Sequence, residues 1–398
     1  MLTAILLPFW LIGTILPPTL SSEYMDVLQV CSLLWLPIIG LISGRSKFLF
    51  GPICRERLSV VAWLCAGIVA ISGSALASLD PIRSLGYVLA AAAGLVACAG
   101  LWQVVGRRKM IQGLSAYAIA GTCLTTYLYA FGPRVQGRLS VSATSHPNFL
   151  GLVAFGVLMC ALLVPSRLVA ALLIAVNVLV IVATQSRGSL VASLLGLLTY
   201  GALRARQLKR NSMVAIAAVA MVVTLMLPWY QDSIQASISS LLFLDDKYRG
   251  LGTGFTGRLE AWEEAIALFR DNPVLGVGFR MHEHYMTTLS SAHNGYLSLL
   301  AESGVLGTAT WLIVVGLTMS LLFRRALRGD LLSALGFSFS VGYLFLATFE
   351  RFFLNMGNPT SILTWLFLLM PSITPSPVAR ASASVANEGI WLPNTRAS

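Results

Sequence analysis

The stretch "RLVAALLIAVNVLVIVATQSRGSLVASLLGLLTYGALRAR", residues 167–206, contains two long apolar runs joined by only a few polar residues. A helix needs about 20 apolar residues to cross the hydrocarbon part of a bilayer, and each run comes close to that length. Over the whole chain, 57% of the residues are hydrophobic and 11% are charged, against roughly 25% charged in a typical soluble domain. These features predict an all-α polytopic membrane protein.

Similar apolar runs elsewhere predict about twelve transmembrane helices in all. They lie near residues 2–20, 25–43, 58–79, 84–104, 113–131, 148–165, 167–184, 188–203, 212–230, 305–323, 331–349 and 358–372. The first run has no basic segment before it and is therefore expected to be retained as a span. The predicted organisation is helices 1–9 in residues 1–230, one large outer loop containing short helices in 231–304, helices 10–12 in 305–372 and a disordered cytoplasmic tail in 373–398.

The charges predict the orientation. With both termini in the cytoplasm, the inner loops and the tail carry 17 of the 27 basic residues, as the positive-inside rule requires. The basic excess behind the pI of about 9.7 is thus expected in short cytoplasmic loops beside an anionic lipid leaflet. It therefore needs no nucleic acid to explain it, and no nucleic acid is expected as a partner. The six cysteines show no CxxC spacing, so neither a metal site nor a disulfide is indicated.

Inside the outer loop, "TGRLEAWEEAIALF" predicts an amphipathic helix, with Thr256 as its N-cap and Pro273 beyond its end. Arg258 falls in the first turn, where a guanidinium and the unpaired backbone N–H groups of a helix start can bind one anion together. The other interpretation is a surface arginine paired with Glu260. The glycines of "GLGTGFTG" and the nearby Gly276 and Gly278 are expected to form flexible loops.

Three more arginines face outward against the general charge bias. Arg187 lies between two apolar runs at the outer headgroup level, where it can hold the phosphate of a lipid carrier or simply extend to water. Arg134 and Arg138 precede the His-Pro-Asn turn that begins at His146. We treat Arg134, Arg138 and His146 as candidate substrate-binding residues.

The loop ends in "SAHNGYLSLLAESGVLG", residues 291–307, where His293 and Asn294 come directly before a helix-forming run. An imidazole can act as the base for a hydroxyl nucleophile, although a histidine at a helix start can also be structural. Asn294 can orient polar groups, and Tyr296 can pack on a sugar ring. Glu302 can orient a base or a substrate, or it can belong to a helix end capped by Gly304.

Three of these motifs, in this order, resemble the O-antigen ligase and O-antigen polymerase superfamily of bacterial membrane glycosyltransferases. They are "SRG" at 186–188, "GRLEAW" at 257–262 followed by "NPVLGVGF" at 272–279, and "HNGYLSLLAESGVLG" from 293. The resemblance implies a transfer without metal or cofactor, at the periplasmic face of the bacterial inner membrane. A glycan would pass from an undecaprenyl-pyrophosphate carrier to a hydroxyl of an acceptor glycolipid or glycan. It also implies that Arg187 and Arg258 bind the donor pyrophosphate and that His293 acts on the acceptor.

The favoured activity is that of an O-antigen ligase with a lipid A-core acceptor, and the alternative is an O-antigen or exopolysaccharide polymerase. A transporter of lipid-linked sugars would be expected to carry ionisable residues inside its spans. The predicted spans have essentially no Asp, Glu, Lys or Arg away from their ends, which favours an enzyme. A purely structural assembly partner would keep its effect without His293 and the two arginines.

Overall fold

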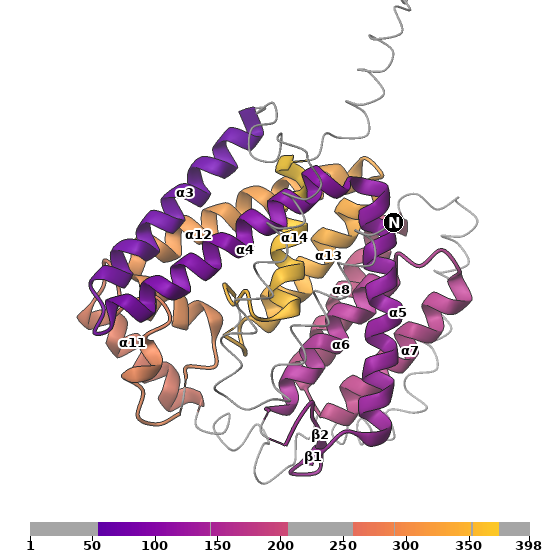
Figure 1. The fold of residues 1–398 in the computed structure, drawn as a ribbon, viewed down its shortest axis with the longest axis horizontal. Coiled ribbons are helices and arrows are strands. Elements are labelled where there is room, and N and C mark those ends of the chain that lie inside the picture. The colour runs from indigo at the N-terminus through magenta and orange to yellow at the C-terminus, as the bar shows by residue number, and fades with distance from the viewer. Residues whose placement is uncertain (1–54, 144, 206–257, 290, 352, 374–398) are drawn as a thin grey trace, which may run out of the picture.

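The computed structural model describes residues 55–143, 145–205, 258–289, 291–351 and 353–373, and these residues form a helix bundle (Figure 1). The α-helices are α3 (Arg55–Leu76), α4 (Pro81–Val105), α5 (Arg107–Phe131), α6 (Pro147–Ala161), α7 (Arg167–Thr184), α8 (Arg187–Ala205), α11 (Arg258–Asp271), α12 (Gly295–Leu327), α13 (Leu331–Leu346) and α14 (Pro359–Ile373). A short hairpin, β1 (Arg134–Val135) and β2 (Arg138–Leu139), and a single 3₁₀ turn, η4 (His282–His284), complete the described elements.

Nine of the predicted spans correspond to helices of the bundle. The runs at 2–20, 25–43 and 212–230, most of the outer loop and nearly all of the tail lie outside the described residues. Five of the described helices, α3, α4, α7, α8 and α12, are long and apolar enough to cross a membrane. The prediction of an all-α membrane protein is confirmed at this level, whereas the count of twelve remains a prediction.

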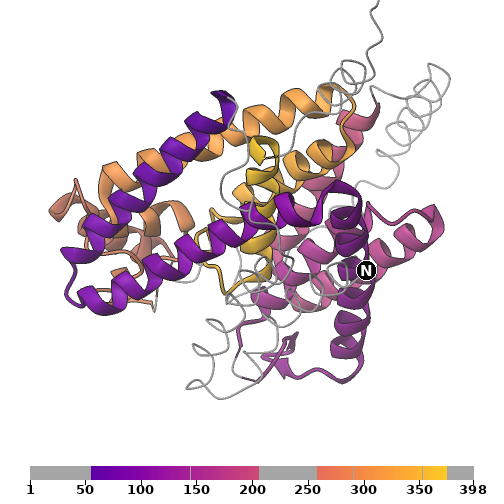
Figure 2. The same cartoon turned by 45° about the horizontal axis from the view of Figure 1, so that its top comes forward.

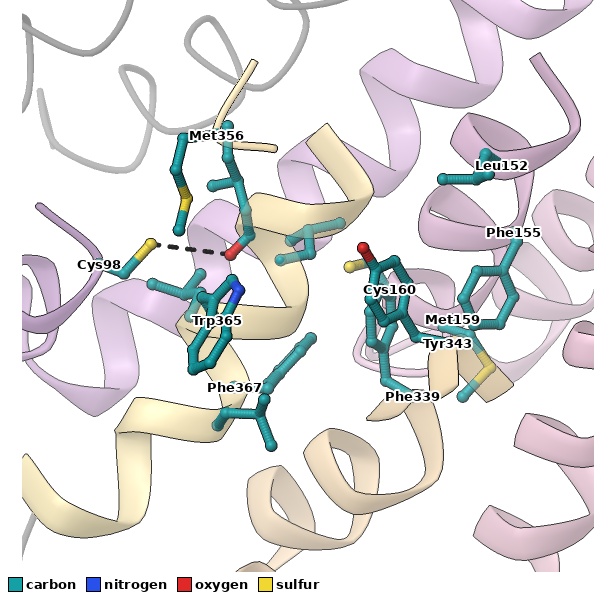
Figure 3. Packing of buried hydrophobic residues seen from close by; sticks show 14 of the residues in the cluster. Cys98, Leu152, Phe155, Met159, Cys160, Phe339, Tyr343, Met356, Trp365 and Phe367 are labelled. Atoms are coloured by element: carbon teal, nitrogen blue, oxygen red, sulfur yellow. Dashed lines mark hydrogen bonds between the residues drawn. The ribbon is translucent and has the colours of Figure 1, made fainter. Parts of the chain in front are cut away.

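Helices α13 and α14 lie in the middle of the bundle and connect its two parts (Figures 1 and 2). On one side, α3 and α4 pack with α12 and α14, and on the other side α6 and α8 pack with α13. Figure 3 shows the aromatic centre between them, where Phe339 lies 5.0 Å from Phe155 and 5.3 Å from Phe367, measured between ring centroids. Helices α6 and α14 consist largely of apolar residues, and nearly all of their described side chains are buried inside the bundle.

The outer surface of the bundle is also apolar. Val69 on α3 is 70% exposed, Leu172 on α7 is 57% exposed and Leu198 on α8 is 61% exposed. Such side chains are unfavourable in water and fit the hydrocarbon of a bilayer. These exposed apolar side chains therefore agree with the membrane character that the composition predicts.

The connections between helices gather at two ends of the bundle. One end, which we call the site end, contains the α3–α4, α7–α8 and α13–α14 connections, the β-hairpin, α11, and the start of α12. Hydrogen bonds tie these segments together, including Gly295 N–H to the Ala347 carbonyl at 2.7 Å and Ser84 Oγ to the Phe279 carbonyl at 2.7 Å. The predicted outer residues that the structure describes therefore lie at one end.

The amphipathic helix is confirmed as α11, which begins at Arg258 and ends at Asp271 before Pro273. The segment after it is no flexible loop. Gly276 has φ 71° and Gly304 has φ 58°, and a Cβ on either would come within 2.5 Å of backbone atoms of the other segment. The prediction of flexible glycines at 276 and 278 is wrong, because these glycines let the chain after α11 lie directly against a kink in α12 at Gly304.

Candidate functional site

His293 lies at the centre of the site end, in the residues just before α12. Its φ of 45° places it in the left-handed region, which a side chain with a Cβ adopts at a cost in free energy. The next residue, Asn294, is the N-cap of α12, and its Oδ1 accepts the backbone N–H groups of Tyr296 and Leu297 at 3.0 and 3.1 Å. The helix start therefore holds the imidazole in a defined, half-buried position.

Burial, together with nearby positive charge, favours the neutral form of the His293 ring. Burial lowers the pKa of His293 to about 4, and the charges of Arg258 and His282 act in the same direction. At neutral pH the ring can therefore accept a proton. It is a weaker base than an exposed histidine, whose pKa is near 6.5.

His146 lies beside His293, with 6.5 Å between the two ring centroids. It is the N-cap of α6, and its Nδ1 accepts the backbone N–H of Asn148 at 3.2 Å. Pro147 occupies the first position of the helix, where a missing N–H costs nothing. The His-Pro-Asn turn thus brings a second histidine from the first half of the chain to the same place as His293.

A line of polar contacts runs from the β-hairpin to the α13–α14 connection. Arg138 is 7% exposed, and its Nη2 donates to Asn148 Oδ1 at 2.5 Å. Asn148 Nδ2 in turn donates to Glu350 Oε1 at 2.6 Å. Burial raises the pKa of Glu350, and the nearby charges of Arg258 and Arg138 offset this only in part.

Arg138 also fixes the turn that precedes α8. Its Nε donates to the Thr184 carbonyl at 2.8 Å, and its Nη2 also reaches the Gln185 carbonyl at 3.4 Å. Gln185 ends α7 in the left-handed conformation, and Arg187 begins α8 two residues later. Arg138 is thus placed to position Arg187, whereas Arg134 is exposed on the hairpin.

A third histidine, His282, is fully buried behind α12. Its Nδ1 lies 2.5 Å from Glu302 Oε1, and its Nε2 lies 3.4 Å from Ser298 Oγ, one turn earlier on the same helix. Glu302 therefore orients a histidine, although not His293. Tyr296 donates its hydroxyl to the Leu344 carbonyl at 2.7 Å, so that its ring is anchored to α13.

The structure thus brings His293, Arg258, His146 and Arg138 into one region. Whether Arg187 and Arg258 converge on one anion stays a prediction. Asn148, Glu350 and His282 belong to the same region, and the sequence analysis did not select them. Glu350 could have been selected from the sequence, because it is a single acidic residue directly after an apolar span and directly before an arginine.

The helix bundle with a polar end defines a membrane protein with a candidate site for an anionic substrate. The family model for O-antigen ligase matches residues 168–312, and this match supports placing the chain in the O-antigen ligase superfamily. The matched residues include Arg187, Arg258, His293 and Glu302, while Arg138, His146 and Glu350 lie outside them. A comparison with curated proteins gives no match.

Proposed function

We propose that the chain transfers a glycan from an undecaprenyl-pyrophosphate carrier to an acceptor hydroxyl, as an O-antigen ligase with a lipid A-core acceptor. The observation that carries the proposal is the position of His293, a neutral imidazole next to the charge of Arg258. A glycosyl transfer needs a base at the attacking hydroxyl and positive charge at the departing pyrophosphate, and this pair supplies both.

In this proposal Arg187 and Arg258 bind the donor pyrophosphate, and His293 takes the proton from the acceptor hydroxyl. The acceptor oxygen forms a bond to the anomeric carbon while the bond to the pyrophosphate oxygen breaks. The leaving group keeps the electron pair, and the two guanidinium groups stabilise its charge. His146, Asn294, Tyr296 and Glu302 would shape the binding region, and the reaction would need no metal or cofactor.

The test uses the purified full-length chain in a nanodisc, with an undecaprenyl-pyrophosphate oligosaccharide as donor. Lipid A-core and a second copy of the oligosaccharide are offered separately as acceptors. Transfer to lipid A-core in the presence of a chelator supports the ligase, and chain elongation would instead support an O-antigen or exopolysaccharide polymerase. Transfer to neither acceptor would reject both activities.

The donor site is tested with lysine variants of Arg187 and Arg258, which keep the charge but lose the planar fork. We expect weaker donor binding in each, with Arg270→Ala as the control because Arg270 is exposed in the last turn of α11. Unchanged donor binding in both Arg258→Lys and Arg258→Ala would reduce that residue to a surface charge.

The proposed location is the inner membrane, with both termini in the cytoplasm and residues 231–304 in the periplasm. In Ser240→Cys, the new thiol should react with an impermeant reagent on intact spheroplasts. Reaction only after lysis would overturn this topology.

A further inference from the structure

His282 is a buried titratable residue that takes no part in the proposed reaction steps. Its ring contacts two buried side chains of α12, with Nδ1 2.5 Å from Glu302 Oε1 and Nε2 3.4 Å from Ser298 Oγ. Because an ionised carboxylate only accepts hydrogen bonds, we assign the ring proton to Nδ1, which donates to Glu302. The neutral ring then accepts the Ser298 hydroxyl at Nε2. Both ring nitrogens therefore fix the orientation of His282.

Both contacts of His282 fall on one short part of α12. The helix is interrupted at Gly304, whose φ of 58° and ψ of −163° are not helical. We call residues 295–303, before this interruption, the half-helix. Ser298 and Glu302 lie one turn apart on the same face of it. His293 comes directly before the N-cap of the half-helix, so the position of the half-helix determines where the imidazole of His293 lies.

The chain between α11 and His282 supports the half-helix at its other end. The backbone N–H groups of Val277 and Gly278 donate to carbonyls of its last turn, at 2.9 and 3.1 Å. His282 follows in the same segment and reaches Ser298, in the first turn. One segment therefore holds the half-helix at both ends, and His282 makes the contact nearest to the proposed base.

A polar pair is a costly way to fill a buried position. An imidazole and a carboxylate lose their hydration on burial, whereas apolar side chains of similar size would pack there without that cost. Hydrogen bonds at both ring nitrogens add direction, which apolar packing does not supply. Such support suits a helix start that holds His293 at φ 45°. The charge of His282 also acts on His293, in agreement with a short distance between the two rings.

We propose that His282 is a positioning residue: held by Glu302, it fixes the half-helix through Ser298 and so holds His293 against the acceptor hydroxyl. This role rests on the proposed function, because it assigns a further residue to the same site. His282 exchanges no proton with the substrate and makes no bond to it. Its contribution is geometric, since a displacement of about 1 Å at a reacting group can cost about 10² in rate.

The contact is tested in the purified full-length chain in nanodiscs, with the donor and acceptor of the transfer assay. The rate constant kcat is counted per donor-binding site, so that a loss of folded protein does not lower it. Ser298→Ala removes the hydroxyl, and we expect kcat to fall about tenfold while the acceptor KM changes little. Ser298→Thr keeps a hydroxyl and should restore most of the rate.

Ser303→Ala is the matched control. Ser303 is also buried in the half-helix, but its hydroxyl donates to the Leu299 carbonyl of its own helix at 2.7 Å. We expect kcat in this variant to equal that of the wild type. An unchanged kcat in Ser298→Ala, or an equal loss in Ser303→Ala, would overturn the proposal.

A double-mutant cycle tests whether His282 is the partner that matters. His282→Asn places an amide nitrogen where the ring has Nδ1, so that Glu302 keeps a donor while the contact with Ser298 is lost. We expect kcat to fall as far as in Ser298→Ala, and the double variant to lose no more, because both changes remove the same interaction. Fully additive losses would show that the two residues act separately and would reject the positioning role.

A measurement without turnover separates this role from the proposed function. Diethylpyrocarbonate modifies accessible neutral imidazoles, and mass spectrometry of the peptides gives the rate at His293, with His146 as the internal reference. Loss of one hydrogen bond should loosen the half-helix, so we expect modification of His293 to be about fivefold faster in Ser298→Ala than in wild type or Ser303→Ala.

The two measurements distinguish the two possible failures. A wild type that transfers no glycan would refute the transferase, while faster modification of His293 in Ser298→Ala would still support the positioning by His282. A wild type that transfers glycan, with kcat and the modification of His293 both unchanged in Ser298→Ala, would refute the positioning role alone.

Discussion

Asp330 and Glu350 are both buried carboxylates, 5% and 8% exposed, at opposite ends of α13. Burial would raise the pKa of each. At Asp330 hydrogen bonds from Arg107 and Ser333 outweigh burial, and the pKa is lowered. At Glu350 burial outweighs the charges of Arg258 and Arg138, and the pKa is raised.

The difference lies in how each carboxylate meets its arginine. The Asp330 carboxylate accepts hydrogen bonds from both terminal nitrogens of Arg107. It also accepts hydrogen bonds from the Leu332 backbone N–H and the Ser333 hydroxyl. At Glu350 the Asn148 amide lies between the carboxylate and Arg138 and hydrogen-bonds to both. The ion pair of Asp330 with Arg107 joins α13 to the start of α5, whereas the charge of Arg258 acts both on Glu350 and on His293. We therefore expect Asp330 to matter for stability, and the region around Glu350 to matter for the proposed reaction.

The sharpest test of this contrast is His293→Ala. The chain should fold and bind the lipid-linked donor through the arginines, while single-turnover transfer falls by about 10² to 10⁴, the usual contribution of a positioned base. Arg270→Ala serves as the control in the same assay. Near-normal transfer would reject the catalytic role, and loss of folding would make His293 a structural residue.

Asp330→Ala should show the opposite behaviour. It leaves Arg107 without its carboxylate in a partly buried position, which costs about 3 kcal/mol of stability. Thermal unfolding of the detergent-solubilised protein measures the loss. The transfer rate per folded molecule should change little, and a loss of rate without a loss of stability would contradict the structural role.

The pH dependence of kcat/KM tests the charge environment of His293. Only the neutral ring can accept a proton, so lowering its pKa to about 4 keeps it active as the pH falls below the usual 6.5. We expect the acid side of the profile to have its midpoint near 4 in the wild type. In Arg258→Ala one of the causes is removed, and the midpoint should move to higher pH. An unchanged midpoint in that variant would show that Arg258 does not act on His293.

Glu350→Gln should have the smallest effect. The amide oxygen can still accept the Asn148 hydrogen bond, and the raised pKa of Glu350 means that its charged form is already disfavoured. We expect less than about 1 kcal/mol of lost stability, against the larger loss in Asp330→Ala. A loss as large as in Asp330→Ala would show that both ends are held by equivalent ion pairs.

Much of the fold is readable from the chain itself. The apolar runs gave the described helices to within a few residues in most cases, because burial in a bilayer demands continuous apolar sequence. The end of α11 before Pro273 follows from the local chemistry of a helix stop. The motifs around Arg187, Arg258 and His293 are also local in sequence, so that they could be selected without a structure.

Only the tertiary structure decided which polar residues meet. Asn148 and Glu350 are 202 positions apart, and His282 is 20 positions away from Glu302, the residue that it contacts. The pattern of apolar residues predicts where each helix begins and ends, but it does not predict which other helices will pack against it. The side chains that surround His293 are therefore set by the packing of helices from distant parts of the chain.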